Sequence, residues 1–238
     1  MKCRIADFNI ELFCRGRGLK TSCQPYLADF DDADFTFRVT DEDIEEESRL
    51  QYEEFSKSYL ESVAACRKLC SMLPEKEGFI LHAATFEAKG KGIAFLAKSG
   101  TGKSTHMLLW QRLLCEDFHI INGDKPIVRI IDGLPYAYGT PWCGKEGLAD
   151  NRAVLLTDLC FIKRSEENKV VRLDKGEAVN MLLRQIVMPK GNEKLVKIIQ
   201  MLDTVVNKCN IWEIYCNTDI SAGETSIKAI LGEKLNET

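Results

Sequence analysis

Apolar and polar residues follow two different periods along this chain, and together the two periods predict a mixed α/β fold. Apolar residues at alternate positions, or in short runs bounded by glycine, proline or polar residues, predict strands. Such strands are expected at residues 4–12, 34–40, 78–86, 92–97, 119–122, 127–131, 135–138, 154–156 with 159–162, and 211–216. Apolar residues at helical spacing predict a helix starting at residue 41, a long helix ending near Pro74, and helices at 106–114, 176–187, 193–207 and 226–231.

Two short turns indicate that antiparallel hairpins supply much of the sheet. Lys89-Gly90-Lys91-Gly92 joins the strand at 78–86 to the strand at 92–97. Asp132-Gly133 joins the strand at 127–131 to the strand at 135–138. The first hairpin is expected to place His82 on a strand directly beside 92–97. We therefore expect a smaller N-terminal α+β segment at residues 1–75, followed by a catalytic domain at residues 76–238 that is built on a mixed sheet.

A glycine-rich stretch connects the apolar strand at 92–97 to the helix at 106–114, which is the context of a phosphate-binding loop. Its residues are Ser99, Gly100, Thr101, Gly102, Lys103, Ser104 and Thr105. The glycines allow successive N–H groups to point inward, and the start of the helix adds partial positive charge. Lys103 can then reach the β- and γ-phosphates, while the Ser104 hydroxyl can ligate Mg²⁺. Ala97 departs from the usual first glycine, and the alternative is a glycine turn capped by Ser and Thr.

Three further residues are candidates for the chemistry of this site. Asp124 ends the strand that follows the loop helix, so it is either a second Mg²⁺ ligand or an aspartate in a turn before a proline. His82 is either a satisfied core histidine or a group beside the phosphate loop. Lys145 ends the loop 139–145, which either closes over an anionic substrate or forms a rigid turn with Trp142 buried.

Composition and charge narrow the classes of function. The net charge is −4 and basic residues are scattered, which argues against nucleic-acid binding as the main task. No stretch approaches the ~20 apolar residues that cross a bilayer, and no signal segment is recognisable. The ten cysteines include no C-x-x-C pair, so we expect reduced thiols in a cytoplasmic protein. The acidic run at 41–47 is better explained as a helix start capped by Thr40 than as a metal site.

Residues 78–190 resemble the catalytic domain of HPr kinase/phosphorylase and the nucleotide-binding domain of ATP-dependent phosphoenolpyruvate carboxykinase. The segments I-N-G-D-K-P at 121–126 and G-T-P-W-C-G-K at 139–145 are similar to those of small stand-alone HPr-kinase-like proteins. The resemblance implies a P-loop-containing mixed sheet, with ATP at Ser99–Thr105, Mg²⁺ at Ser104 and Asp124, and His82 near the transferred phosphoryl group. It also implies a hydroxyl acceptor such as serine. Those families carry two adjacent aspartates where this chain has Gly123-Asp124.

The predicted activity is Mg²⁺-dependent phosphoryl transfer from ATP to a hydroxyl of a peptide, a protein or a small molecule. Lys103 and Mg²⁺ would neutralise the developing charge on the phosphate oxygens, and Lys145 would close over the site. Either His82 or Asp124 would orient or deprotonate the acceptor. Because only one carboxylate is available, metal binding is the preferred role of Asp124, and His82 is the better candidate base. The alternative from another class is a nucleotide-binding sensor without phosphotransferase chemistry. A carboxykinase-type lyase is disfavoured because 238 residues leave little room for a full substrate-binding half.

Overall fold

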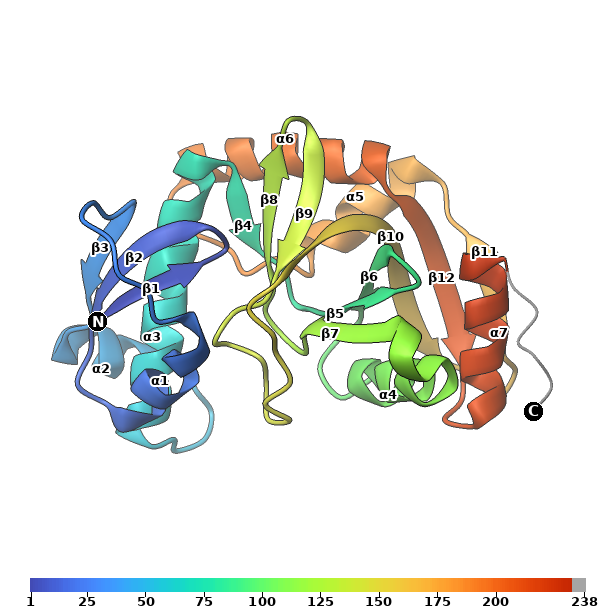
Figure 1. Cartoon of the computed structure of the whole chain (residues 1–238), viewed down its shortest axis with the longest axis horizontal. Coiled ribbons are helices and arrows are strands. Elements are labelled where there is room, and N and C mark those ends of the chain that lie inside the picture. The colour runs from blue at the N-terminus through green and yellow to red at the C-terminus, as the bar shows by residue number, and fades with distance from the viewer. Residues whose placement is uncertain (233–238) are drawn as a thin grey trace.

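A computed structural model describes residues 1–232 and shows a mixed α/β molecule with two sheets (Figure 1). The small sheet has three strands in the order β1-β2-β3, and the large one has nine. In Figure 1 the small sheet lies at the blue end of the molecule, and its strands overlap the ribbon of α3 in this view.

The small sheet begins with a hairpin of β1 (Lys2–Ile5) and β2 (Phe8–Phe13), and β3 (Phe35–Arg38) pairs parallel to β2. The sequence predicts a single strand at residues 4–12, and this prediction is wrong. Ala6 and Asp7 adopt φ angles of 52° and 60°, which turn the chain between the two strands. The strand expected at 34–40 is present as β3.

Five helical segments accompany the small sheet: α1 (Arg17–Ser22), η1 (Gln24–Tyr26), α2 (Asp41–Leu50), α3 (Lys57–Met72) and η2 (Leu73–Lys76). The Thr40 side chain accepts from the Asp43 N–H, and the Asp43 carboxylate accepts from the Thr40 N–H. This capping box confirms the acidic run as a helix start. The core of this region also includes Ile127 and Trp142 from the rest of the chain, and the boundary at residues 75 and 76 stays a prediction.

The large sheet curls and contains both parallel and antiparallel pairs. Its strands are β4 (Gly78–Ile80), β5 (Ala83–Ala88), β6 (Lys91–Leu96), β7 (Phe118–Asn122), β8 (Ile127–Ile131), β9 (Leu134–Tyr138), β10 (Ala153–Arg164), β11 (Lys169–Arg172) and β12 (Asn210–Cys216). Their order is β4-β8-β9-β10-β6-β5-β7, with β12 on β10 and β11 on β12. β6, β10 and β12 are parallel neighbours, so their carboxyl ends meet at one edge.

The strand predicted at 78–86 is interrupted, which corrects the expected position of His82. β4 pairs with β8, β5 pairs with β6, and Leu81 and His82 lie between the two strands. The backbone there pairs with a distant segment instead, because the His82 N–H donates to the Gln185 carbonyl at 2.7 Å and the Val187 N–H to the Ile80 carbonyl. His82 therefore precedes β5 and is not in register with β6.

Five further helical segments accompany the large sheet: α4 (Lys103–Leu114), η3 (Cys115–Asp117), α5 (Lys175–Leu183), α6 (Asn192–Lys208) and α7 (Ile220–Leu231). Successive side chains of β6 point to opposite faces of the sheet. Phe95 packs in the core with α4 and α7, whereas Leu96 packs in the core with α5 and α6. α5 ends at residue 183, earlier than expected, and α7 is longer than the predicted helix at 226–231. None of the helices within residues 1–232 has the length and apolar content needed to cross a membrane.

Candidate functional site

The turn between β6 and α4, residues 98–102, is called the glycine turn below. Gly100 and Gly102 have φ angles of 77° and 121°, a conformation that side chains disfavour, so both positions require glycine. α4 begins directly afterwards at Lys103. Ala97 is not among the residues with positive φ, so alanine carries no backbone strain there. The predicted succession of strand, glycine turn and helix is therefore present in the structure.

An arginine from a neighbouring strand fixes this turn. Arg164, the last residue of β10, donates from Nε to the Thr101 carbonyl at 3.1 Å and from its terminal nitrogen to the Gly100 carbonyl. Both hydrogen bonds hold carbonyl groups of the turn toward β10. Arg164 thus acts on the conformation of the turn from a distant position in the sequence, 63 residues from Thr101 and 64 from Gly100, and sequence reasoning missed it.

Four side chains converge beside the glycine turn, and we call them the Asp124 cluster: His82, Lys103, Asp124 and Lys125. The Lys103 ammonium donates to the Ala97 carbonyl at 2.8 Å and lies 3.3 Å from Nε2 of His82. The same ring nitrogen lies 3.2 Å from Oδ1 of Asp124, and Oδ2 of Asp124 pairs with the Lys125 ammonium. The structure thus brings His82, Lys103 and Asp124 together and adds Lys125.

The charges of the cluster determine how its groups ionise. Burial opposes ionisation of Asp124, yet the hydrogen bond from His82 and the charge of Lys125 outweigh it and hold the Asp124 pKa well below its usual range. Burial lowers the pKa of Lys103, with Asp124 acting in the opposite direction. Burial also disfavours the charged form of Lys125, but Asp124 raises its pKa overall. Asp124 is therefore a firmly ionised carboxylate and a weak proton acceptor near neutral pH.

Nε2 of His82 lies within hydrogen-bond distance of two groups with opposite roles. Lys103 can only donate, which requires a bare Nε2, and the Asp124 carboxylate can only accept, which requires a protonated Nε2. Lys103 already has the Ala97 carbonyl as an acceptor. We therefore assign the hydrogen on Nε2 to the bond with Asp124. In the neutral ring this assignment leaves Nδ1 as the nitrogen that can take up a proton.

The loop that follows β9 explains why position 123 is glycine. A Cβ at Gly123 would lie 2.9 Å from the Cys143 carbonyl and 3.4 Å from that of Leu148, so the loop occupies the space a side chain would need. The Gly123 N–H donates to the Leu148 carbonyl at 2.8 Å. Close backbone packing therefore disfavours a side chain, and with it a second carboxylate, beside Asp124.

The same loop is attached to the N-terminal part of the chain. Nε1 of Trp142 donates to the Ser62 carbonyl of α3 at 2.9 Å, and the Asn151 amide donates to the Pro25 carbonyl at 3.2 Å. Trp142 is buried, as in the rigid-turn alternative. Lys145 is exposed and forms no hydrogen bond or ion pair with any described residue. The structure does not bring Lys145 into the Asp124 cluster.

The predicted metal ligands form only a partial site by themselves. Ser104 is half-buried in the first turn of α4, and Oδ2 of Asp124 is engaged by Lys125. No group of three or more His, Cys, Asp or Glu residues able to hold a metal occurs within residues 1–232. One hydroxyl and one carboxylate suit Mg²⁺ when the phosphates of a nucleotide and water supply the remaining ligands. The donor set therefore fits a metal that arrives with a nucleotide.

A cavity of about 680 Å³ borders the glycine turn, and none of the four residues of the Asp124 cluster lines it. The start of α4 and the ends of β10 and β12 form its walls, including Thr105, His106, Arg164, Glu166 and Thr218. Sequence reasoning missed these wall residues from β10 and β12 because they lie far from the glycine-rich stretch in the chain. Their only sequence signal is their position just after strands.

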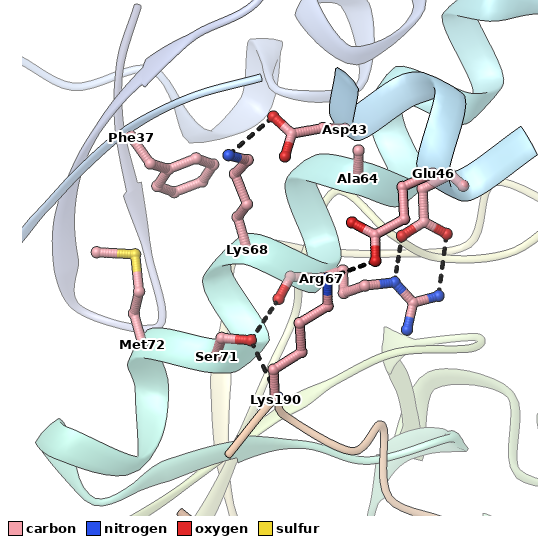
Figure 2. Close-up of a pocket in the computed structure, with 10 residues that line it drawn as sticks. Phe37, Asp43, Glu46, Ala64, Arg67, Lys68, Ser71, Met72 and Lys190 are labelled. Carbon is pink, nitrogen blue, oxygen red and sulfur yellow. Dashed lines mark hydrogen bonds and ion pairs between the residues drawn. The ribbon is translucent and has the colours of Figure 1, made fainter. Parts of the chain in front are cut away.

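A second cavity, of about 390 Å³, lies between α2, α3 and Lys190 (Figure 2). Its charged residues form three pairs, which we call the α2–α3 ion-pair cluster: Arg67 with Glu47, Lys68 with Asp43 at 2.8 Å, and Lys190 with Glu46 at 2.6 Å. Figure 2 shows each cation directed at a carboxylate of α2. The charges of this cavity therefore compensate one another.

Comparison with known proteins provides little beyond this geometry. No protein-family model matches the chain, and no curated protein matches it. Among solved structures, the chain is similar to the HPr(Ser) kinase/phosphatase from Coxiella burnetii, with a TM-score of 0.30 and 12% identity over 52% of this chain and 87% of that one. So low a TM-score indicates a distant relationship of fold at most and supports no conclusion about the site.

Proposed function

We propose that the chain binds a nucleoside triphosphate, with ATP as the expected form, together with Mg²⁺ at the glycine turn, and transfers the terminal phosphoryl group to a hydroxyl group. The observation that carries this proposal is the state of Lys103. Lys103 is 7% exposed, and it makes no direct ion pair with a described residue. The charge of Asp124 acts on it from a distance, but burial still lowers its pKa. A buried ammonium without a directly bonded carboxylate is costly in the free protein and favourable for an anionic ligand.

The surroundings of Lys103 fit a phosphate chain in particular. The glycine turn and the start of α4 present backbone N–H groups in a conformation that two glycines make possible. Phosphoryl transfer depends chiefly on positioning and on stabilising charge on the phosphate oxygens. Lys103 would supply that charge next to the turn. Mg²⁺, when bound through Ser104 and Asp124, would supply further charge neutralisation.

The pair of His82 and Asp124 would serve the acceptor hydroxyl. Nδ1 of His82 would take the hydroxyl proton, and the carboxylate of Asp124, bonded to Nε2, would stabilise the resulting imidazolium. Asp124 itself is a poor base because its pKa lies well below the usual range. Lys125 would keep Asp124 in place. The acceptor is a hydroxyl of a peptide, a protein or a small molecule.

A nucleotide sensor without transfer is the second candidate, and the packing at Gly123 favours it. That packing leaves Asp124 as the one carboxylate of the cluster, so metal binding and base catalysis cannot be divided between two acids. Both candidates share nucleotide binding at the glycine turn. They differ in whether a phosphorylated product forms.

Titration calorimetry with Mg²⁺-ATP, followed by product analysis with serine peptides and small alcohols, tests the proposal. We expect His82→Ala to retain nucleotide affinity and to lose transfer by about 10²–10⁴-fold, as removal of a general base does. Asp124→Asn should raise the Mg²⁺ concentration required. His119→Ala, which alters an exposed histidine of β7, is the matched control. Binding without product would favour the sensor, and the absence of nucleotide binding by the unaltered chain would refute both candidates.

A further inference from the structure

The cavity of about 680 Å³ lies where the carboxyl ends of three parallel strands meet. Leu96 of β6 is level with Phe161 of β10, and Arg164 of β10 is level with Cys216 of β12. The glycine turn and the loops after β10 and β12 therefore emerge at the same edge of the sheet. In open α/β sheets, ligands bind outside the carboxyl ends of such strands.

The glycine turn separates this cavity from the Asp124 cluster. Gly100, Thr101 and Gly102 line the cavity, whereas none of the four cluster residues does. A triphosphate bound on the turn with its terminal phosphate beside Lys103 would therefore have its other end directed toward the cavity. That end is the nucleoside.

The polar groups of the cavity suit a ligand that donates hydrogen bonds. Arg164 is committed to the carbonyls of the turn. The Asn217 side chain is committed to the loop, since its amide donates to the Glu166 carbonyl and its oxygen accepts from the Asp219 N–H. The Glu166 carboxylate has no hydrogen-bond or ion-pair partner among the described residues, and it is exposed at the cavity.

His106 of the same cavity wall is buried and is anchored in the core. Nε2 of His106 lies 2.9 Å from the Ser226 hydroxyl, which also accepts from Nε1 of Trp110. Its Nδ1 is buried and has no partner within residues 1–232. The acceptor that the cavity offers to a ligand is therefore the Glu166 carboxylate, next to a turn that offers donors, which matches the hydroxyl groups and the phosphates of a nucleotide respectively.

We propose that this cavity is the nucleoside subsite and that the Glu166 carboxylate accepts hydrogen bonds from the ribose hydroxyls, so that the protein selects ribonucleotides over 2′-deoxyribonucleotides. The proposal rests on the proposed nucleotide binding at the glycine turn. Ile162 and Cys216 provide the buried, apolar part of the wall for the base. Glu166 lies at the solvent side, beside which a ribose attached to the α-phosphate would stand.

The test is the ratio of the affinities for ATP and 2′-deoxy-ATP, measured by calorimetry with Mg²⁺ present. The unaltered chain should bind ATP about tenfold more tightly, because a hydrogen bond to a charged acceptor is lost with the 2′-hydroxyl. Glu166→Ala should reduce this ratio to about one. Glu167→Ala, which removes the adjacent exposed carboxylate outside the cavity, should leave the ratio unchanged. Removing a negative charge changes the affinities for ATP and 2′-deoxy-ATP by the same factor, so the ratio of the two affinities reports only on the contact with the 2′-hydroxyl.

Each outcome separates this proposal from the proposed function. Equal affinities for the two nucleotides, or a ratio that Glu166→Ala does not alter, would overturn the ribose assignment while nucleotide binding stands. Inosine triphosphate, which differs from ATP only in its base, tests whether Glu166 contacts the base. If Glu166→Ala abolishes discrimination between ATP and inosine triphosphate instead, the carboxylate contacts the base and the proposal is wrong. Failure of the unaltered chain to bind any of these nucleotides refutes the proposed function itself.

Discussion

The α2–α3 ion-pair cluster and the Asp124 cluster contain similar residues but differ in how their charges are paired. In the first, three cations face three carboxylates in one-to-one pairs. In the second, one carboxylate is shared by His82 and Lys125, and Lys103 is held by a main-chain carbonyl. The comparison shows that a concentration of charge does not by itself mark a site. An unpaired, buried charge is the more informative feature.

The physical consequences differ accordingly. The paired charges join α2 and α3 to each other and to Lys190, so they act on the stability of the fold. The buried ammonium of Lys103 is stabilised only in part by its carbonyl partner, which leaves free energy available to a ligand.

The largest effect is expected from removing one lysine of each region. Lys103→Ala should weaken Mg²⁺-ATP binding by two to three orders of magnitude, because it removes a desolvated charge from the phosphate site. Lys68→Ala should leave the affinity unchanged, since Lys68 is paired with Asp43 far from the glycine turn. Calorimetric titration of both variants measures this difference. Equal affinities would remove the functional distinction between the two regions.

Between pH 6.5 and pH 4, stability should depend chiefly on His106 in the first turn of α4, whereas the α2–α3 ion-pair cluster should act mainly at lower pH. Burial lowers the pKa of His106 from 6.5 to about 4. Between these values the unfolded chain binds the proton and the folded chain does not, so stability should fall as the pH decreases through this window, by about 3 kcal/mol in all.

Denaturant unfolding between pH 7 and pH 4 measures this dependence. His106→Gln should abolish most of it, whereas His119→Gln, at an exposed position, should not. The ion pairs act at lower pH, because Lys68 and Lys190 lower the pKa values of Asp43 and Glu46 below 3.8 and 4.5. Their contribution is present above those values and is lost on further acidification. A pH dependence that survives in His106→Gln would contradict this assignment.

A smaller effect is expected from the central pair of the α2–α3 ion-pair cluster. Glu47 is 2% exposed and accepts from two nitrogens of Arg67. Glu47→Gln replaces one acceptor by a donor, which should lower the free energy of unfolding by about 2 kcal/mol and leave nucleotide affinity unchanged. Glu45→Gln, in an exposed pair with Arg49, should cost less than about 1 kcal/mol. A change in ATP affinity in Glu47→Gln would contradict this prediction, because it would show that the α2–α3 ion-pair cluster and the nucleotide site are energetically coupled.

The smallest effect concerns the missing second carboxylate. Gly123→Asp would bring the carboxylates of the Asp124 cluster closer in number to its cations, as in the α2–α3 ion-pair cluster. The added Cβ would lie 2.9 Å from the Cys143 carbonyl, so we expect a loss of about 1 kcal/mol of stability and no gain of transfer. Gly123→Ala isolates the steric part. A gain of transfer in Gly123→Asp would show that charge, and not packing, limits the site.

Local sequence signals predicted the parts of the fold and site that depend on neighbouring residues. Thr40 was predicted to cap the helix at residue 41 because its acidic neighbours follow it directly, and the structure adds a reciprocal bond from Asp43. Gly100 and Gly102 indicate a turn in the sequence because glycine is the residue that adopts a positive φ without strain. Lys103 and Asp124 were predicted from their positions after strands, although their assigned roles stay predictions.

Features that depend on distant partners were not predictable in this way. The stretch 78–86 is apolar apart from His82 and Thr85, and the interruption at His82 arises from hydrogen bonds with residues 185–187. Similarly, Asp158 interrupts the apolar pattern of β10 without interrupting the strand, because Trp212 and Asn210 donate to its buried carboxylate. Glu166 reaches the cavity only through the parallel pairing of β10 with β6. Periodicity alone contains no information about such pairings.

β10 also has a consequence for how the protein opens. Its first residues pair with β9, its middle with β6 and its last residues with β12, so one strand belongs to both the antiparallel and the parallel parts of the large sheet. Neither part can separate without disrupting this strand. The main-chain amides of β6, β10 and β12 are therefore expected to exchange with deuterium only through the same global unfolding event. The strands that support the glycine turn are then expected to be the most slowly exchanging part of the protein. Such strands would hold a glycine-rich turn on a rigid support.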